Sequence, residues 1–407
     1  MTTGAAHRGA TESEAEDDMQ CLVIGAGVMG AATAAALARR GVGVTLVEAE
    51  PRAASGTSGT SFAWVNANRK PRPDYHDLNA AGVAAHHELA RRARDHGRDA
   101  AWFHPFGHLE WAVDPRHRAE LRTRVGRLME RGYPVRWLTP AEARSREPRL
   151  RVPADADVAL FPEEAHCDPA ALADALLAEA AALGADVRFG ARAVGLTERT
   201  DGAEAVLASG ERLHADRVVC CAGNGTPALL AGLGATVPMV APARGNAAMG
   251  LLAVTAATDS GVRGVVTTDE VNLRPWPGGR LLVQALELDA AADPDAAPDP
   301  ALGAAFHDRL AAVLAGGPAP GIETVVTGRR VLPADGFTVA GPLDGHPAVY
   351  VLVSHSGVTL APLLGALAAE ELDTGRPAAL LAGFRPGRFA AGTPFPPVTA
   401  ARRPGEQ

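Results

Sequence analysis

Aromatic residues, lysine and a basic surface are what this sequence lacks. Phe, Trp and Tyr make up 4% of the 407 residues, so alanine, valine and leucine have to fill the hydrophobic cores. Lys70 is the single lysine, and the basic residues form no stripe along the chain. With a formal net charge of −8, the chain offers little attraction to a phosphate backbone, and we expect no nucleic-acid partner.

Cysteines and long apolar runs are also few. The four cysteines have the spacing of neither a metal site nor a disulfide framework. This pattern predicts buried thiols in a reducing cytoplasm, and the alternative is a vicinal disulfide between Cys220 and Cys221. No apolar run reaches bilayer-spanning length and no charged-then-apolar leader is present, so we expect no membrane segment. His76, His86 and His87 have no ligand partners in the pattern, and we expect no metal site.

The composition that remains is typical of a folded α/β protein. Hydrophobic residues at 47% and charged residues at 21% are enough for two domains, each with its own core. The exception is residues 1–18, where five carboxylates accompany one arginine. Such a segment cannot bury enough apolar surface to offset its ordering entropy, and we expect a disordered tail.

A nucleotide-binding βαβ unit stands at the start of the folded region. Gln20–Ile24 reads as a buried strand, Ala31–Arg40 as a helix that Gly41 ends, and Val42–Val47 as a second strand that closes on Glu48. A Gly-x-Gly-x-x-Gly pattern fills the turn between the first strand and the helix.

Each residue of this pattern has a physical task. Gly25 permits the tight turn, Gly27 lets the backbone approach a pyrophosphate, and Gly30 lets helix and strand pack closely. The free N–H groups and positive dipole end of the helix favour the diphosphate. Glu48 is expected to accept hydrogen bonds from the adenosine ribose and to repel a 2′-phosphate, which disfavours NADP.

The choice between FAD and NAD rests on the segment after Glu48. A nicotinamide enzyme would continue with regular βα units, whereas here the Ser/Thr/Gly loop Ala53–Asn68 comes next. Gly223–Ala228 also comes directly after a strand and offers a second nucleotide site as the alternative. It lacks a long helix behind it and an acidic strand end, so we interpret it as a turn beside the first nucleotide. Without a second site, the reducing equivalents are expected to come from the substrate rather than from NAD(P)H.

The rest of the chain mixes helices with short strands. The expected helices are Asp77–His96, Pro115–Arg131, Pro169–Leu183 with Asp168 as N-cap, Ala301–Ala315 and Thr359–Thr374 with Pro362 in its first turn. The expected strands are His108–Val113, Gly184–Phe189, Ala191–Thr197, Glu204–Ser209, Arg217–Ala222, Val271–Trp276, Arg280–Leu286 and Ala348–Ser354.

Five segments, taken in order, resemble one family of flavoproteins. They are the glycine fingerprint, the loop Ala54–Ser58, the helix start at Asp168 and Pro169, the strand and turn Val218–Gly223, and the paired motifs Gly328–Gly336 and Ser354–Pro362. Over about Cys21–Leu372 the chain resembles the D-amino-acid oxidase superfamily, nearest its glycine oxidase and sarcosine oxidase branch.

The resemblance implies an α/β (α+β) fold of D-amino-acid oxidase type, in which an FAD-binding Rossmann-like domain interleaves with a mixed-sheet substrate domain. The FAD-binding domain would comprise residues 19–85, 150–233 and 328–400, and the substrate-binding domain residues 86–149 and 234–327. No cysteine follows Cys221 and no histidine lies in the loop after Glu48, so FAD is expected to be held noncovalently.

The residues expected at FAD share the loops and helix starts that face the cofactor in this family. They are Gly25, Ala26, Gly27, Val28, Met29, Gly30, Glu48, Ala49, Thr57, Ser58, Ser61, Ala63, Trp64, Val194, Ala222, Gly223, Gly328, Ser356, Gly357, Val358 and Thr359. The helix start after His355 would direct its N–H groups and dipole at the flavin ring.

Three residues are expected to act on the substrate. In the family, Arg330 would pair bidentately with a substrate carboxylate, although Val331 stands where proline is usual. Lys70 would attract oxygen or a substrate anion, and His355 would act as a base or contact the flavin. Trp64 and Trp276 are candidate walls of an apolar pocket, with ordinary core packing as the alternative.

The reaction that such a site implies is hydride transfer from a small amine or amino-acid-like substrate to FAD, which yields an imine, with peroxide formed from oxygen. None of the three tyrosines matches those that help to hold the carboxylate in D-amino-acid oxidases, so a free amino acid is not required as substrate. The alternatives are a flavin dehydrogenase with another acceptor, a non-catalytic flavin-binding subunit, and a hydroxylase that consumes NAD(P)H. The sequence leaves the oligomeric state open.

Overall fold

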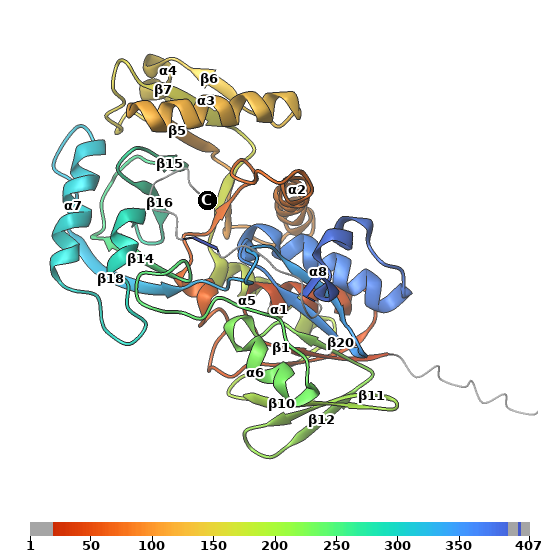
Figure 1. Cartoon of the computed structure of the whole chain (residues 1–407). Helices are drawn as coiled ribbons and strands as arrows, with labels where there is room; N and C mark the ends of the chain where they lie inside the picture. The colour runs from red at the N-terminus through yellow and green to blue at the C-terminus, as the bar shows by residue number, and fades with distance from the viewer. Residues whose placement is uncertain (1–18, 390–397, 400–407) are drawn as a thin grey trace, which may run out of the picture.

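The computed structural model describes residues 19–389 and 398–399, so the predicted acidic tail lies outside the described residues. Its architecture is α/β, with a Rossmann-like parallel sheet and a second, larger mixed sheet whose strands come from separate parts of the chain (Figure 1). This confirms the predicted fold class. Among the helices of the described ranges, none is long and apolar enough to cross a membrane.

The six-stranded sheet contains the predicted nucleotide-binding unit. Its order is β19 (Val339–Leu343), β20 (His346–Val353), β13 (Arg217–Cys220), β1 (Gln20–Ile24), β2 (Gly43–Val47) and β9 (Asp186–Arg188). All neighbours are parallel except β19 and β20. The strands predicted at these positions are therefore confirmed, and β19 was not foreseen.

Alternate residues of β1 enter two different cores. Cys21 and Val23 face the helices α1 (Val28–Arg39), α5 (Pro169–Ala182) and α8 (Gly357–Thr374). Leu22 and Ile24 face the opposite side of the sheet. That side is covered by the three-stranded sheet of β10 (Ala193–Arg199), β11 (Gly202–Leu207) and β12 (Arg212–Ala215), together with the short α6 (Thr226–Leu230). A central strand buried on both faces explains why its sequence is continuously apolar.

The larger sheet has eight strands and its own helices. Its order is β18 (Ile322–Arg329), β14 (Met249–Thr255), β17 (Arg280–Gln284), β16 (Asn272–Trp276), β15 (Val265–Thr267), β5 (His108–Ala112), β7 (Asp157–Phe161) and β6 (Arg136–Leu138). The helices around it are α7 (Ala301–Val313), α3 (Pro115–Glu130) and α4 (Pro140–Arg146) (Figure 1). A separate small sheet has the order β3 (Trp64–Val65), β8 (Ala165–Cys167) and β4 (Phe103–His104). The exact domain boundaries stay a prediction.

Most predicted helices are confirmed, with small shifts at their ends. Asp168 caps α5 as expected, because its carboxylate accepts hydrogen bonds from the N–H groups of Ala170 and Ala171. The helix α2 (Pro73–Asp95) begins four residues before its predicted start. The four cysteines are buried and free, so Cys220 and Cys221 form no vicinal disulfide.

The start of α8 corrects one expectation. The helix begins at Gly357 rather than at Thr359, which moves Pro362 from the first turn into the interior. Because proline has no N–H, the carbonyl of Val358 has no partner one turn later in the helix. His86 on α2 replaces it, since its Nε2 lies 2.7 Å from that carbonyl oxygen. His86, for which the sequence indicated no role, therefore replaces the backbone hydrogen bond that Pro362 cannot make in α8.

Gly365 lets α1 and α8 approach closely. A Cβ built at Gly365 would lie within 3 Å of backbone atoms of Ala32 and Thr33, which cannot move aside as a flexible side chain can. We expect Gly365→Ala to lower the free energy of unfolding by about 1–3 kcal/mol through overpacking. Gly126, in α3, has no atom within 4 Å of the same position. Gly126→Ala should therefore be neutral or stabilising by up to about 1 kcal/mol. Urea unfolding of both variants checks this, and an equal effect of the two would contradict it.

Candidate active site

A long groove runs along the carboxyl ends of the parallel strands. Ile24, Val47 and Val353, the last residues of β1, β2 and β20, line this cavity of about 760 Å³. Most residues predicted at FAD also line it: Gly25, Gly27, Val28, Met29, Glu48, Ala49, Thr57, Ser58, Ser61, Val194, Ala222, Gly223, Gly357 and Val358. In open α/β sheets, ligands bind at this edge.

The glycines of the fingerprint have the predicted geometry. Gly25 has a φ of +105°, which disfavours any side chain, and a Cβ there would lie 2.7 Å from the carbonyl oxygen of Cys221. At Gly30 a Cβ would come within 1.8 Å of the carbonyl oxygen of Gly25. Gly30 and Ala26 are buried behind the groove, so they shape the turn without lining the groove itself.

Glu48 fixes the turn from the end of β2. Its carboxylate accepts hydrogen bonds from the N–H of Ala26 at 2.6 Å and from the N–H of Glu50 at 2.9 Å. Each carboxylate oxygen has further lone pairs, so a ribose can still be bound by the same group. The groove has a glycine turn without side chains at the end of one strand and a carboxylate at the end of the next. Together with its volume, this arrangement fits a dinucleotide.

The position of Gly223 shows where the second glycine segment lies. It has a φ of +56° and lines the same groove as Gly25, and the helix that comes after it, α6, has five residues. The segment is therefore a turn on the same groove as the first glycine turn, and its contact with the nucleotide stays a prediction.

The loop after β2 connects the groove with the larger sheet. Ser58 Oγ accepts a hydrogen bond from the N–H of Val28 at 3.2 Å, at the start of α1. Thr57 Oγ1 donates to the carbonyl oxygen of Arg329 at 2.5 Å, at the end of β18. Ala54 and Ala63 have φ values of +54° and +53°, a conformation that is costly for alanine and that clusters at functional sites.

A smaller cavity of about 130 Å³ continues from this groove. Thr57, Ser61, His355 and Val358 are among the residues that line both spaces. The other predicted residues on its walls are Ala63, Trp64, Lys70, Gly328, Arg330, Ser356 and Thr359. The structure therefore brings the three predicted catalytic residues together beside the predicted flavin position. Trp276 is not on these walls, and instead stacks on the buried guanidinium of Arg274 at 5.0 Å.

Cations, and no carboxylates, face the smaller cavity. Lys70, Arg329 and Arg330 line it, and no aspartate or glutamate of the described chain does. Burial, Lys70 and Arg330 together lower the pKa of His355 to about 3, even though its ring opens to the cavity space. His355 is therefore neutral at physiological pH.

The start of α8 is joined to the segment that carries Trp64. Thr359 Oγ1 donates to the carbonyl oxygen of Trp64 at 3.2 Å and accepts from the N–H of Asn66 at 3.3 Å. Ser356 Oγ accepts from the hydroxyl of Tyr75 at 2.9 Å. These contacts fix the helix start against the cavity wall.

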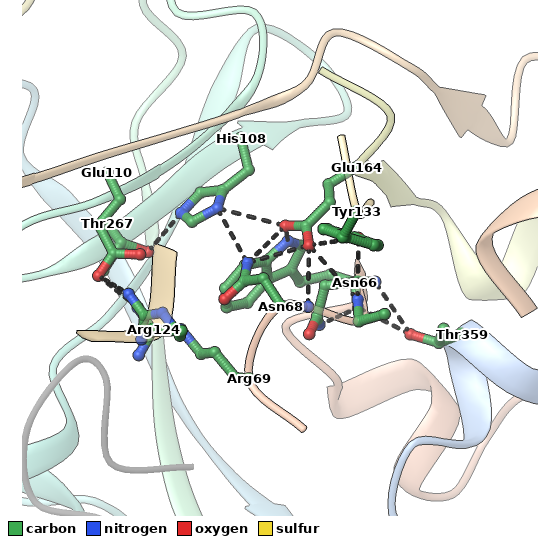
Figure 2. Close-up of polar contacts among 12 residues, drawn as sticks. Asn66, Asn68, Arg69, His108, Glu110, Arg124, Tyr133, Glu164, Thr267 and Thr359 are labelled. Atoms are coloured by element: carbon green, nitrogen blue, oxygen red, sulfur yellow. Dashed lines mark hydrogen bonds and ion pairs between the residues drawn. The ribbon is translucent and has the colours of Figure 1, made fainter. Parts of the chain in front are cut away.

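A buried carboxylate, Glu164, holds the other side of this segment (Figure 2). It accepts from Asn68 Nδ2 at 2.8 Å, from the Tyr133 hydroxyl at 2.8 Å and from Trp64 Nε1 at 3.0 Å. The N–H groups of Ala67 and Asn68 also point at it, at 3.3 and 3.2 Å. Burial and Glu164 raise the pKa of Tyr133 well above its usual range, so that hydroxyl stays a donor.

A second buried cluster anchors the residue before Lys70. Glu110 accepts from Arg69 at 3.0 Å, from Arg124 at 2.6 Å and from His117 Nε2 at 2.9 Å (Figure 2 shows the two arginines). Burial opposes the charge of Glu110, but Arg124 and Arg69 hold its pKa well below the usual range. Burial likewise opposes the charge of His117, while Asp269 and Glu110 raise its pKa to about 9.

Sequence reasoning missed both of these carboxylates. Glu164 and Glu110 belong to no motif, and their partners are 31 to 100 and 7 to 41 positions away along the chain. The signal that existed was indirect, since glutamate rarely stays in an apolar strand or strand end unless it is paired. Phe62, Asn66 and Gln284, which also line the smaller cavity, gave no signal at all.

The comparisons with known proteins identify the family. The profile described as "FAD dependent oxidoreductase", DAO, matches residues 20–371. The chain belongs to the DAO family of FAD-dependent oxidoreductases. FAD is its cofactor, and the predicted family and cofactor are confirmed; noncovalent attachment stays a prediction.

Relatives of the chain include enzymes with different substrates in their names. The tRNA 5-methylaminomethyl-2-thiouridine biosynthesis bifunctional protein MnmC of Thiobacillus denitrificans is 30% identical over 382 residues. That match covers 90% of this chain, which spans 59% of the relative's length. Glycine oxidase from Geobacillus kaustophilus has a TM-score of 0.78 at 23% identity, covering 92% of this chain and 100% of that one. L-proline dehydrogenase from P. horikoshii has a TM-score of 0.78 at 18% identity, covering 92% and 98%. These two structures share the fold.

Glu48 is expected to be needed for FAD affinity. We predict that Glu48→Ala weakens FAD binding by about 10- to 100-fold, the worth of a lost charge-assisted hydrogen bond. Glu50→Ala is the matched control, because Glu50 also lines the groove but is half exposed and pairs with Arg192. It should change the affinity by about threefold or less. Fluorescence titration of the FAD-free protein measures both, and equal losses would show that the carboxylate of Glu48 has no special role.

Glu164 is expected to matter for stability. In Glu164→Gln, an NH2 group replaces one carboxylate oxygen, so its N–H bonds would face the donors that now bind that oxygen. We expect the free energy of unfolding to fall by about 2–4 kcal/mol. The neighbouring Glu163 has a side chain that is 56% exposed, so Glu163→Gln should change it by less than about 0.5 kcal/mol. Denaturant unfolding distinguishes the two, and a neutral Glu164→Gln would disprove the role assigned to this carboxylate.

Proposed function

We propose that this protein oxidises a small amine or amino-acid-like substrate at a carbon next to nitrogen. The observation that carries the proposal is the smaller cavity, which opens into the FAD groove at His355 and the start of α8. It has room for a small molecule, and Phe62 and Trp64 supply apolar walls. The names of the structural relatives, glycine oxidase and L-proline dehydrogenase, support a substrate with a C–N bond.

FAD, when bound, supplies the acceptor for a hydride that leaves the substrate carbon. The residues of the chain have to present the substrate in the correct protonation state and orientation. A neutral amine is needed, because its nitrogen lone pair has to assist departure of the hydride. Lys70 and Arg330, whose charges help to lower the pKa of His355, also lower the pKa of an ammonium group bound beside them.

His355 contributes a neutral ring at this position. With a pKa of about 3 it does not retain a proton near neutral pH, so it adds no charge beside the substrate nitrogen. Its free ring nitrogen can accept a hydrogen bond from the amine. Trp64, held by Glu164 and Thr359, limits the orientations that the substrate can adopt. The start of α8 faces the expected flavin ring, where its N–H groups and positive dipole end favour negative charge.

Oxygen is the electron acceptor that we propose, with hydrogen peroxide as the product, in a cytoplasmic protein. A dehydrogenase that passes its electrons to another acceptor is the alternative, and a non-catalytic flavin-binding subunit is the third. Peroxide formation under air separates the first two. Loss of the flavin absorption under anaerobic conditions separates both from the third.

The similarity to MnmC favours a second substrate, an amine within a modified tRNA nucleoside. The name of that relative contains a methylaminomethyl group, which has the C–N bond that this chemistry needs. The match covers nearly the whole of this chain but 59% of the relative, so the substrate of the whole relative is not transferred. The net charge of −8 argues for a small free molecule.

The test is an anaerobic titration of the purified protein with a panel of amines. The panel contains primary and secondary amines, each with and without a carboxylate, together with total bacterial tRNA. We expect at least one small amine to bleach the flavin absorption near 450 nm, with an imine-derived carbonyl product. Bleaching by tRNA alone would favour the second substrate, and a flavin that no compound reduces would contradict the proposed oxidation.

A further inference from the structure

The charge balance of the smaller cavity identifies which cation is free to bind an anion. Three basic residues line the cavity, but their surroundings differ. A guanidinium or ammonium group that already has a protein carboxylate has little net charge left for a ligand. The partners of each group therefore decide which of them can recognise a substrate.

Arg330 already has a carboxylate partner. Its Nη2 forms an ion pair with Asp289 at 2.5 Å. Its Nη1 donates to the carbonyl oxygen of Ala247 at 3.1 Å and to that of Met249. The Asp289 side chain is 5% exposed, so the pair is shielded from water and its partners hold each other strongly. The carboxylate-binding role predicted for Arg330 would require it to share or leave Asp289.

Arg329 is open to solvent. It is exposed, and its Nη2 donates to the carbonyl oxygen of Pro294 at 2.6 Å. It lines the FAD groove as well as the smaller cavity, where exposure to water weakens its attraction for a ligand.

Lys70 has no carboxylate of its own among the described residues. No hydrogen bond or ion pair of its ammonium group is found within residues 19–389 and 398–399, and its nearest aromatic contact is the Tyr75 ring, 5.9 Å from Nζ. The field of Glu164 raises the pKa of Lys70, but no ion pair joins the two groups, and the Glu164 oxygens accept hydrogen bonds from Asn68, Tyr133 and Trp64 instead. The half-buried ammonium group therefore lines the cavity without a directly bonded carboxylate among the described residues.

We infer that Lys70, rather than Arg330, binds an anionic group of the substrate. The inference rests on the proposed function and narrows its substrate class to small amines that bear a carboxylate. The neighbours of Lys70 are preorganised for this task, because Arg69 is anchored on Glu110 and the backbone of Ala67 and Asn68 is anchored on Glu164. A substrate anion would give the Lys70 ammonium group the direct partner that it lacks among the described residues.

The pH dependence of anion binding separates lysine from arginine. Burial and Arg69 lower the pKa of Lys70 to about 8, and Glu164 opposes them. The other groups that face Lys70 are Tyr75 and His355, whose pKa of about 3 keeps it from titrating in this range. An anion that binds Lys70 should thus lose affinity as pH rises through about 8, up to about tenfold per pH unit above it. An anion bound by Arg330 should show no such fall, because arginine stays charged.

The experiment measures calorimetric binding of propanoate to the FAD-loaded protein between pH 6.5 and 10. Propanoate has no amine, so it cannot be oxidised, and its carboxyl group is ionised throughout. Propanamide is the neutral match. We expect Lys70→Gln to weaken propanoate binding by about 10- to 100-fold and to leave propanamide binding unchanged. Lys70→Arg should retain most of the affinity and lose the pH dependence, and the flavin spectrum of each variant reports that it is folded.

The double variant Arg330→Gln/Asp289→Asn tests the competing residue without leaving a buried charge unpaired. We expect it to bind propanoate within about threefold of the parent protein. The inference is overturned if Lys70→Gln binds propanoate normally, if the double variant loses as much affinity as Lys70→Gln was expected to lose, or if the parent protein does not bind propanoate. None of these outcomes depends on turnover, so they can be told apart from a failure of the proposed oxidation.

Discussion

Glu164 lies between β7 of the eight-stranded sheet and β8 of the small sheet, and its carboxylate is removed from water. A buried carboxylate is tolerated where donors surround it, and here the donors come from the segment around Asn68, from Tyr133 and from Trp64. These hydrogen bonds join the segment of the cavity wall that carries Trp64 and Asn68 to Tyr133, which lies after α3. The positions of Trp64 and Lys70 depend on them.

The active-site cavity inherits its positive charge from this arrangement. Glu110 and Asp289 pair with arginines, and the oxygens of Glu164 accept hydrogen bonds from Asn68, Tyr133 and Trp64 rather than from Lys70. The cavity wall carries basic side chains, whereas the carboxylates of Glu164, Glu110 and Asp289 do not line the cavity. Burial lowers the pKa of both His355 and Lys70; Lys70 and Arg330 add to the effect at His355, and Arg69 adds to it at Lys70.

The parts of the fold that sequence could predict are those fixed by neighbours along the chain. The β1–α1–β2 unit was predicted within a few residues, because its glycine turn, its apolar strands and Glu48 all lie within 29 positions. The resemblance to the family extended this to the loops that line the groove. Pairing across long separations was out of reach. Arg330 and Asp289 are 41 positions apart, and no local pattern indicates that one neutralises the other. The same limit explains His86, whose bond to Val358 depends on where α8 begins relative to Pro362.

The lone lysine has a chemical consequence of its own. Besides the terminal α-amino group, the chain offers acylating or reductively alkylating reagents one amine, and that amine lies on the wall of the active-site cavity. With a pKa of about 8, a large share of it is unprotonated, and hence nucleophilic, under mildly alkaline conditions. A single side-chain adduct in the mass spectrum would therefore report access to this cavity directly, and a surface rich in arginine would remain unlabelled.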